Sequence, residues 1–198
     1  MYVSQKHRRH KRHRANDDDD NASDDDESPE VIQIRNRVYF HCPVTRKTVL
    51  ALIQKLEEAE TYALTNEQPS IYLFIHSEGG DAYAGLSAMN HVQTRRLPVD
   101  TVADGFVASA ATFILLGGRV RYGMRHAAVL IHQLTTGFWG KFEFMKDEVT
   151  NSAQLMDTFR DLYTRETRMK KKKVNKVQLF MNAYKYRNMI YLRIGGGK

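Results

Sequence analysis

The sequence contains a single cysteine, Cys42, so a disulfide within the chain is excluded. No apolar run approaches the roughly 20 residues that a membrane-spanning helix needs. The phosphate-binding pattern Gly-x-x-x-x-Gly-Lys-Ser/Thr is also missing, which argues against nucleotide hydrolysis by this chain itself. The stretch after Met1 is charged rather than apolar, so we expect no secretory signal and a reducing, cytoplasmic location.

Metal-site signals are weak as well. The three histidines His7, His10 and His13 are spaced like possible ligands, but they lie in an arginine-rich tract that would repel a cation. We therefore expect no metal ion, and nothing else in the sequence calls for a cofactor.

Charge is unevenly distributed along the chain. Residues 1–30 combine a basic cluster with two acidic blocks and have almost nothing apolar to bury, so we predict a disordered charged tail. The basic cluster leaves a nuclear-localisation signal open as an alternative. Residues 165–198 hold 11 Lys and Arg side chains and one acid, within an overall net charge of +7. We interpret this end as a solvated basic surface rather than a nucleic-acid site, because no base-stacking motif accompanies the charge.

Between these ends, apolar strand patterns alternate with helical ones. The expected strands are 31–40, 71–76, 99–103, 120–122 and 127–131, and the expected helices between them are 45–60, 84–94 and 109–116. This alternation predicts an α/β domain with largely parallel, buried strands. In such a domain the residues that follow the strands meet at one edge of the sheet.

Residues 101–118 contain the strongest candidate for a nucleophile. A short strand is followed by Asp104-Gly105, interpreted as a turn, and Ser109 stands between alanines where a helical pattern begins. A serine in this position can present its Oγ beside free backbone N–H groups. The alternative is that Ser109 only caps the helix, as serine often does.

Two further strand ends add to this signal. The strand at 71–76 leads into Gly79-Gly80, whose backbone can turn N–H groups into a cleft because glycine accepts unusual dihedral angles. The strand at 127–131 leads into His132, which can serve as a general base toward a serine on a neighbouring unit.

These three stretches resemble motifs of the Clp protease proteolytic subunit, a serine peptidase family with a crotonase-like fold. Residues 75–80, Ile-His-Ser-Glu-Gly-Gly, look like the family's Asn-Ser-Pro-Gly-Gly motif. Residues 105–110, Gly-Phe-Val-Ala-Ser-Ala, look like its nucleophile motif Gly-x-Ala-Ala-Ser-Met, and residues 130–133, Leu-Ile-His-Gln, look like its base motif Met-Ile-His-Gln. The motifs occur in the family's order, and the resemblance spans about residues 31–168.

The resemblance implies a fold of repeated βαβ units with a protruding handle helix, here at about 136–168 within a peptidase domain of 31–168. It implies Ser109 and His132 as catalytic residues, Gly80 and Ala110 as backbone donors of an oxyanion hole, and Gly79 with Gly80 as a substrate-binding edge. It further implies unfolded polypeptides as substrates, a homo-oligomeric ring, and an ATP-driven AAA+ unfoldase as partner. No membrane or nucleic-acid partner is expected.

The third member of the catalytic triad is missing from its expected place. The family's aspartate precedes a Phe-Leu-Ser-Ala-like motif, which resembles residues 180–183 here, yet residues 174–178 contain no acid. Asn175 is the polar residue nearest that place, and Glu166, Asp161 and Asp157 are fallback acids on the handle. Residues 169–198 form a basic, divergent C-terminal segment. An impaired scaffold subunit of a mixed ring therefore stays open, as does an acyl-CoA enzyme of the crotonase fold, against which the three motifs argue.

Overall fold

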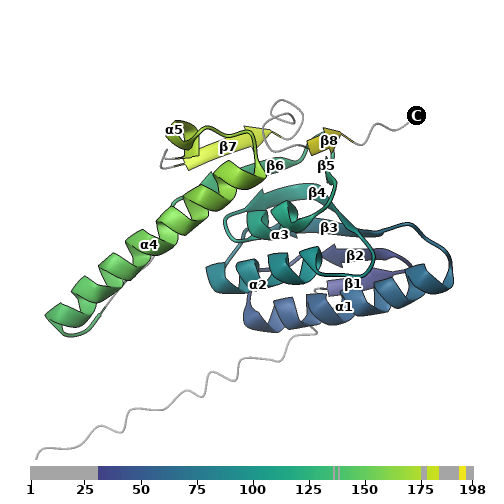
Figure 1. Ribbon diagram of the computed structural model, residues 1–198, viewed down its shortest axis with the longest axis horizontal. Helices are drawn as coiled ribbons and strands as arrows, with labels where there is room; N and C mark the ends of the chain where they lie inside the picture. The colour runs from purple at the N-terminus through teal and green to yellow at the C-terminus, as the bar shows by residue number, and fades with distance from the viewer. Residues whose placement is uncertain (1–30, 136, 138, 175–177, 183–191, 195–198) are drawn as a thin grey trace, which may run out of the picture.

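The computed structural model describes residues 31–135, 137, 139–174, 178–182 and 192–194. It is a mixed α/β structure in which one sheet is accompanied by helices α1 to α3, while α4 extends away from them as a long arm (Figure 1). The helices are α1 (Arg46–Thr65), α2 (Ala82–Gln93), α3 (Ala111–Gly117), α4 (Phe142–Glu166) and α5 (Lys171–Val174). The strands are β1 (Val31–Ile34), β2 (Arg37–Phe40), β3 (Ile71–Ser77), β4 (Val99–Ala108), β5 (Arg121–Gly123), β6 (Ala128–His132), β7 (Gln178–Asn182) and β8 (Leu192–Ile194).

The sheet confirms the predicted α/β class with mostly parallel strands. Its order is β1-β2-β3-β4-β5-β8, and β6 also pairs with β4 while β7 pairs with β6. The pairs β1/β2 and β6/β7 are antiparallel, and the other pairs are parallel. Strand β4 is therefore central, because its first half pairs with β5 and its last three residues pair with β6.

The core lies between the sheet and the three helices α1 to α3. Its largest fully buried side chains include Phe40, Leu52, Leu56, Leu73, Ile75, Ile114 and Leu115. The apolar positions of α1 recur at helical spacing and face the sheet, as the sequence pattern predicts. Thr45 is the N-cap of helix α1. Its Oγ1 accepts from the Thr48 backbone N–H at 3.1 Å as part of a capping box.

Two sequence predictions about the strands are wrong. The predicted strand at 31–40 is a hairpin, because Arg35 takes a φ of +59° and reverses the chain between β1 and β2. The Asp104-Gly105 dipeptide is not a turn either: β4 continues through it, and the pairing with β3 shifts register there. A Cβ on Gly105 would lie 2.3 Å from His76 Nδ1, so this glycine permits a close approach of two strands.

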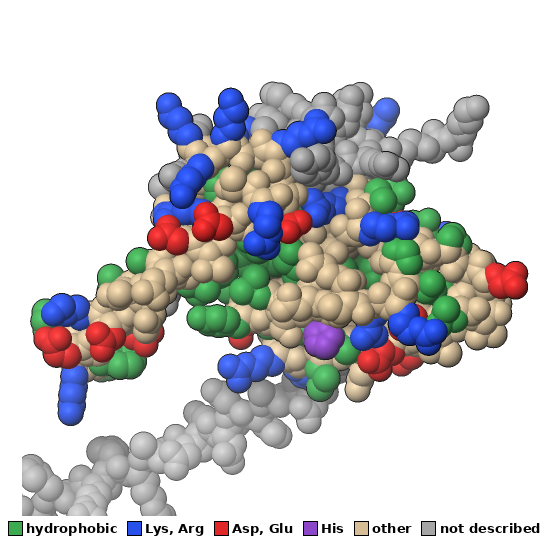
Figure 2. All heavy atoms as spheres, in the orientation of Figure 1, with side chains coloured by type: hydrophobic (Ala, Val, Ile, Leu, Met, Phe, Trp, Pro, Cys, Tyr) green, Lys and Arg blue, Asp and Glu red, His purple; other side chains and the backbone are tan. Residues whose placement is uncertain are grey.

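The handle helix, expected within about 136–168, is α4 over Phe142–Glu166. Its stripe of apolar side chains (Met145, Val149, Ala153, Met156 and Phe159) has two different surroundings. At the base of α4, Phe159 is buried, whereas further out Val149 has 60% of its surface exposed. Phe142 and Phe144 at the outer end are also exposed, and hydrophobic side chains are visible there beside acidic and basic ones (Figure 2). The base of the stripe therefore belongs to the core of this chain and the outer part does not.

Candidate active site

Ser109 lies in the tight connection between β4 and α3. Its φ is +54°, a left-handed conformation that costs a non-glycine residue free energy and is held only by surrounding contacts. Its N–H donates to the Leu130 carbonyl at 2.9 Å, and its carbonyl accepts from the Thr112 N–H at 2.9 Å and the Thr112 hydroxyl at 2.6 Å. The N-cap residue of α3 is Ala110, so the alternative of Ser109 as the helix N-cap is wrong.

His132 ends β6, directly beside the end of β4. Ala108 of β4 and Leu130 of β6 are partners in the parallel pairing of these strands. Ser109 follows Ala108 by one residue and His132 follows Leu130 by two, so both lie just beyond the same paired position. Both side chains line one cavity of about 280 Å³. His132 Nδ1 lies 2.6 Å from the Gln133 carbonyl oxygen. A carbonyl only accepts, so Nδ1 carries the proton in this contact, and in the neutral ring Nε2 is the nitrogen with the lone pair of a base.

The glycine turn after β3 packs directly against Ser109. Gly79 and Gly80 have φ values of +96° and +145°, which side-chain-bearing residues rarely adopt. A Cβ on Gly79 would lie 2.6 Å from Ser109 Cβ, and one on Gly80 would lie 2.3 Å from the Val44 carbonyl oxygen. The turn is anchored because Val44 N–H donates to the Gly79 carbonyl and Asp81 N–H donates to the Val44 carbonyl, both at 2.8 Å.

Two backbone donors near Ser109, one in the glycine turn and one at the start of α3, are left without acceptors. In the described part of the chain, the N–H groups of Gly80 and Ala110 have no hydrogen-bond partner, and both residues line the cavity with Ser109. Free N–H groups beside a nucleophile can stabilise an oxyanion. Asp81 then caps α2, accepting from the N–H groups of Tyr83 at 2.8 Å and Ala84 at 3.1 Å, which holds the chain leaving the turn.

The base of α4 closes one side of the cavity. Phe159 and Tyr163 pack against Phe113 of α3, with ring centroids 4.8 and 5.7 Å apart. The Tyr163 hydroxyl lies 2.5 Å from the Thr112 hydroxyl, and burial raises the pKa of Tyr163 while that hydrogen bond opposes the shift. Five cavity residues were not predicted from the sequence: Met156, Phe159, Arg160, Tyr163 and Val174. The apolar spacing of α4 was an available signal for Met156, Phe159 and Tyr163, whereas Arg160 and Val174 of α5 carried none.

The acids considered from the sequence do not reach this cavity. Asn175 lies outside the described residues, although Val174 before it lines the cavity and Gln178 after it pairs with His132. Asp157 and Asp161 on α4 are exposed, and Asp157 pairs with Arg160. Among the described residues, Glu78 is the one carboxylate in the cavity wall.

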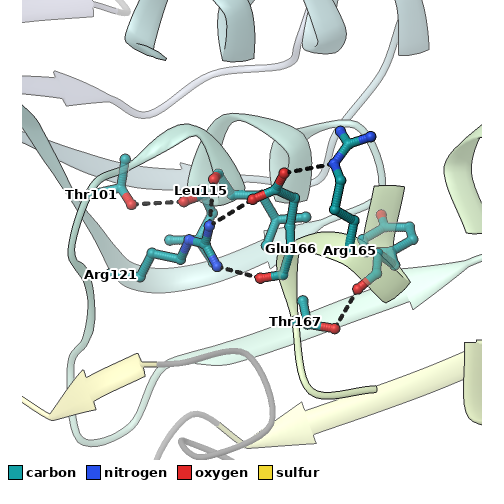
Figure 3. A network of polar contacts seen from close by, with 8 residues as sticks. Thr101, Leu115, Arg121, Arg165, Glu166 and Thr167 are labelled. Atoms are coloured by element: carbon teal, nitrogen blue, oxygen red, sulfur yellow. Dashed lines mark hydrogen bonds and ion pairs between the residues drawn. The ribbon is translucent and has the colours of Figure 1, made fainter. Parts of the chain in front are cut away.

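Glu166 belongs to a separate polar network. Its Oε2 lies 3.3 Å from Arg121 Nη2, its Oε1 accepts from Arg165 Nε at 3.1 Å, and its carbonyl accepts from Arg121 Nη1 at 2.6 Å (Figure 3). Arg121 Nη2 also donates to the Leu116 carbonyl at 2.9 Å. This network joins the end of α4 to β5 and to the end of α3, so Glu166 holds the handle in place.

Glu166→Gln should lower stability without lowering the reactivity of Ser109 toward a fluorophosphonate. Losing the charge weakens a partly buried pair, and we expect a cost of about 1 kcal/mol in the free energy of unfolding. Denaturant unfolding and the rate of fluorophosphonate labelling, measured on the same preparation, check both parts. A rate reduced by orders of magnitude in a folded Glu166→Gln protein would contradict this placement of Glu166.

No group of three or more His, Cys, Asp or Glu side chains able to hold a metal ion occurs in the portion that the structure describes. No helix in this portion is both long and apolar enough to cross a bilayer.

Comparison with known proteins gives one consistent result. A sequence model of the Clp protease family matches residues 29–185. The chain is 29% identical over 156 residues to the ATP-dependent Clp protease proteolytic subunit of Mesostigma viride, covering 73% of this chain and 66% of that protein. It is 29% identical over 147 residues to the subunit of the same name from Chlorokybus atmophyticus (69% and 63%), and 32% identical over 111 residues to that of Lobularia maritima (53% and 55%). The matched region thus spans 55 to 66% of the length of these relatives.

Proposed function

The chain belongs to the Clp protease family, and from this we propose that it is a serine endopeptidase subunit that hydrolyses unfolded polypeptides through an acyl-enzyme. One observation carries the proposal. Ser109 is held at a φ of +54° beside the Gly79-Gly80 turn and lines the same cavity as His132. A strained serine, an adjacent base and free N–H groups are the parts that acyl transfer needs.

The mechanism uses these parts in order. Ser109 Oγ attacks the peptide carbonyl while His132 Nε2 takes the hydroxyl proton, and the carbonyl oxygen becomes an oxyanion bound by the N–H groups of Gly80 and Ala110. The C–N bond then breaks as His132 returns the proton to the leaving amine, which leaves an acyl-enzyme on Ser109. Water, deprotonated by His132, attacks that ester, the C–O bond breaks as His132 gives the proton back to Ser109 Oγ, and the second product leaves as an acid.

The substrate form follows from the shape of the site. A cavity of about 280 Å³ accepts one or two side chains rather than a folded surface. An extended peptide laid along the Gly79-Gly80 turn would place its carbonyl at Ser109 and pair its backbone with that edge. The chain therefore acts on polypeptides that have already been unfolded.

Unfolding must come from a partner, because no nucleotide-binding loop of the Gly-x-x-x-x-Gly-Lys-Ser/Thr type occurs in the sequence. The relatives carry the words ATP-dependent in their names, which supports an AAA+ unfoldase as that partner. The single cysteine supports work in a reducing compartment, the cytoplasm.

The outer part of α4 supports assembly into a homo-oligomeric ring. Trp139, which precedes α4, and Phe142, Phe144 and Val149 within it are exposed to between 52 and 96%. Together they form an apolar surface that a second copy would cover. Sedimentation at micromolar concentration should find an oligomer, and Phe142→Glu combined with Val149→Glu should shift it toward smaller species. A monomer with the wild-type sequence would contradict this assembly.

A catalytically impaired scaffold subunit of a mixed ring is the second candidate. It is favoured by His132, whose Nδ1 donates to its neighbour's carbonyl rather than to an acid. A carbonyl fixes the tautomer but gives less stabilisation than a carboxylate to the imidazolium formed in the transition state.

Hydrolysis of an internally quenched decapeptide separates the two candidates. An active endopeptidase should release fragments cut inside the peptide, identified by mass spectrometry, at a rate that follows enzyme concentration. A scaffold subunit should form the oligomer and leave the peptide intact. Cleavage that proceeds only from the peptide ends would contradict the endopeptidase assignment.

A further inference from the structure

The wall of the cavity that contains Ser109 and His132 includes a cation that the proposed mechanism does not use. Arg160 projects from the base of α4 into this wall, next to Met156 and Phe159. A guanidinium on a mostly apolar wall costs free energy unless an acceptor or anion meets it. Its presence beside the reacting groups points to a negatively charged part of the substrate.

Arg160 is fixed relative to Ser109 by packing. Residues 156, 159, 160 and 163 share one face of α4, and Phe159 and Tyr163 on this face contact Phe113 of α3. The Tyr163 hydroxyl is hydrogen-bonded to the Thr112 hydroxyl, and the Thr112 hydroxyl donates to the Ser109 carbonyl. The same short chain of contacts that holds the nucleophile thus holds the helical turn that bears Arg160.

Only some of the hydrogen-bond donors of the Arg160 guanidinium have an acceptor within the described residues. Its Nη1 donates to Asp157 Oδ1 at 2.8 Å, but the Asp157 side chain is 72% exposed, so water weakens this ion pair. The Nε of Arg160 is buried and has no acceptor in the described residues. A guanidinium offers five N–H donors, so capacity for a further carboxylate remains.

Glu78 is the opposing charge in the same wall. Its side chain is exposed, whereas that of Arg160 is only 27% exposed. Charges act more strongly where water is partly excluded, so the electrostatic preference of the cavity is set mainly by Arg160.

We propose that Arg160 gives this subunit a preference for peptides with Asp or Glu directly before the scissile bond, an inference that rests on the proposed peptidase function. The side chain of that residue is attached to the carbon next to the carbonyl that Ser109 attacks. It therefore enters the cavity beside Ser109, where its carboxylate can form paired hydrogen bonds with the terminal nitrogens of Arg160.

Two fluorogenic peptides that differ only in Glu or Gln at this position test the proposal. In the wild-type protein kcat/KM should be at least about 10-fold higher for the Glu peptide, as expected for a charge-assisted hydrogen bond. Arg160→Gln should bring the ratio to about 1, and Arg160→Lys should keep part of the preference. Arg165→Gln is the matched control, because Arg165 lies on the same helix outside the cavity wall, and it should keep the wild-type ratio.

Binding to the Ser109→Ala protein, measured by fluorescence anisotropy with the same peptides, makes the test independent of turnover. If the Glu peptide binds more tightly and Arg160→Gln removes the difference, the acidic preference is supported, whether or not either peptide is cleaved. Absence of cleavage by the wild-type protein would then count against the peptidase function alone. Ser109-dependent cleavage with equal rates for both peptides overturns the preference and leaves the peptidase function standing. Equal binding, or no binding of either peptide, also overturns it.

Discussion

Ser109→Ala is expected to lower kcat/KM for a fluorogenic peptide by at least about 10³-fold, and His132→Ala should do the same. The first change removes the atom that forms the acyl bond, and the second removes the base that takes its proton. Neither side chain belongs to the buried core, so the thermal unfolding temperature should change little. Steady-state kinetics with circular dichroism on the same samples measures both effects.

Two control variants match these substitutions. Ser87→Ala alters a serine of α2, and His126→Ala alters an exposed histidine before β6, and neither residue lines the cavity. Both controls should keep wild-type rates. Combining Ser109→Ala with His132→Ala should cost little more than either change alone, since the two groups act as a unit. If the fold-loss of kcat/KM in the double variant equals the product of the two single losses, Ser109 and His132 act in separate processes.

Gly80→Ala should reduce kcat by about 10²-fold or more while the protein stays folded. A methyl group there would lie 2.3 Å from the Val44 carbonyl oxygen, and a φ of +145° is unfavourable for alanine, so the turn must move. The movement takes the Gly80 N–H away from the position of the oxyanion, whose stabilisation is realised in the transition state and hence in kcat.

Gly137→Ala is the control for this substitution, because a Cβ on Gly137 would meet nothing within 4 Å. It should leave kcat near the wild-type value. If Gly80→Ala raises KM with kcat unchanged, the turn binds substrate without stabilising the oxyanion. That outcome would remove Gly80 from the catalytic role assigned to it.

The strand ends could be predicted from the sequence because each carries a local signal. Apolar runs at 71–76 and 127–131 end in Gly79-Gly80 and His132, and the parallel sheet brings such ends together. The α/β class was predicted for the same reason, since its hydrophobic periods lie within single segments. The handle helix was expected from the resemblance to the Clp protease family. The structure confirms this fold.

The errors arise where one local pattern fits two structures. Asp104-Gly105 is typical of a turn, but a glycine is equally suited to a strand with a bulge. Which of the two forms here depends on His76, whose Nδ1 accepts from the Phe106 N–H and which lies 30 residues before Phe106 in the chain. Arg160 gave no signal at all, because one arginine in a helix is usually solvated. Its place in the cavity is decided by the contact of Phe159 with Phe113.

Labelling by a serine-reactive fluorophosphonate tests the central claim most directly, because it reports an activated serine without requiring a known substrate. The wild-type protein should become covalently modified, and peptide mass mapping should place the label on Ser109. The Ser109→Ala protein should stay unmodified under the same conditions, and His132→Ala should be labelled far more slowly. A label on another residue, or an oligomeric wild-type protein that takes up no label, would contradict the assignment of Ser109 as the nucleophile.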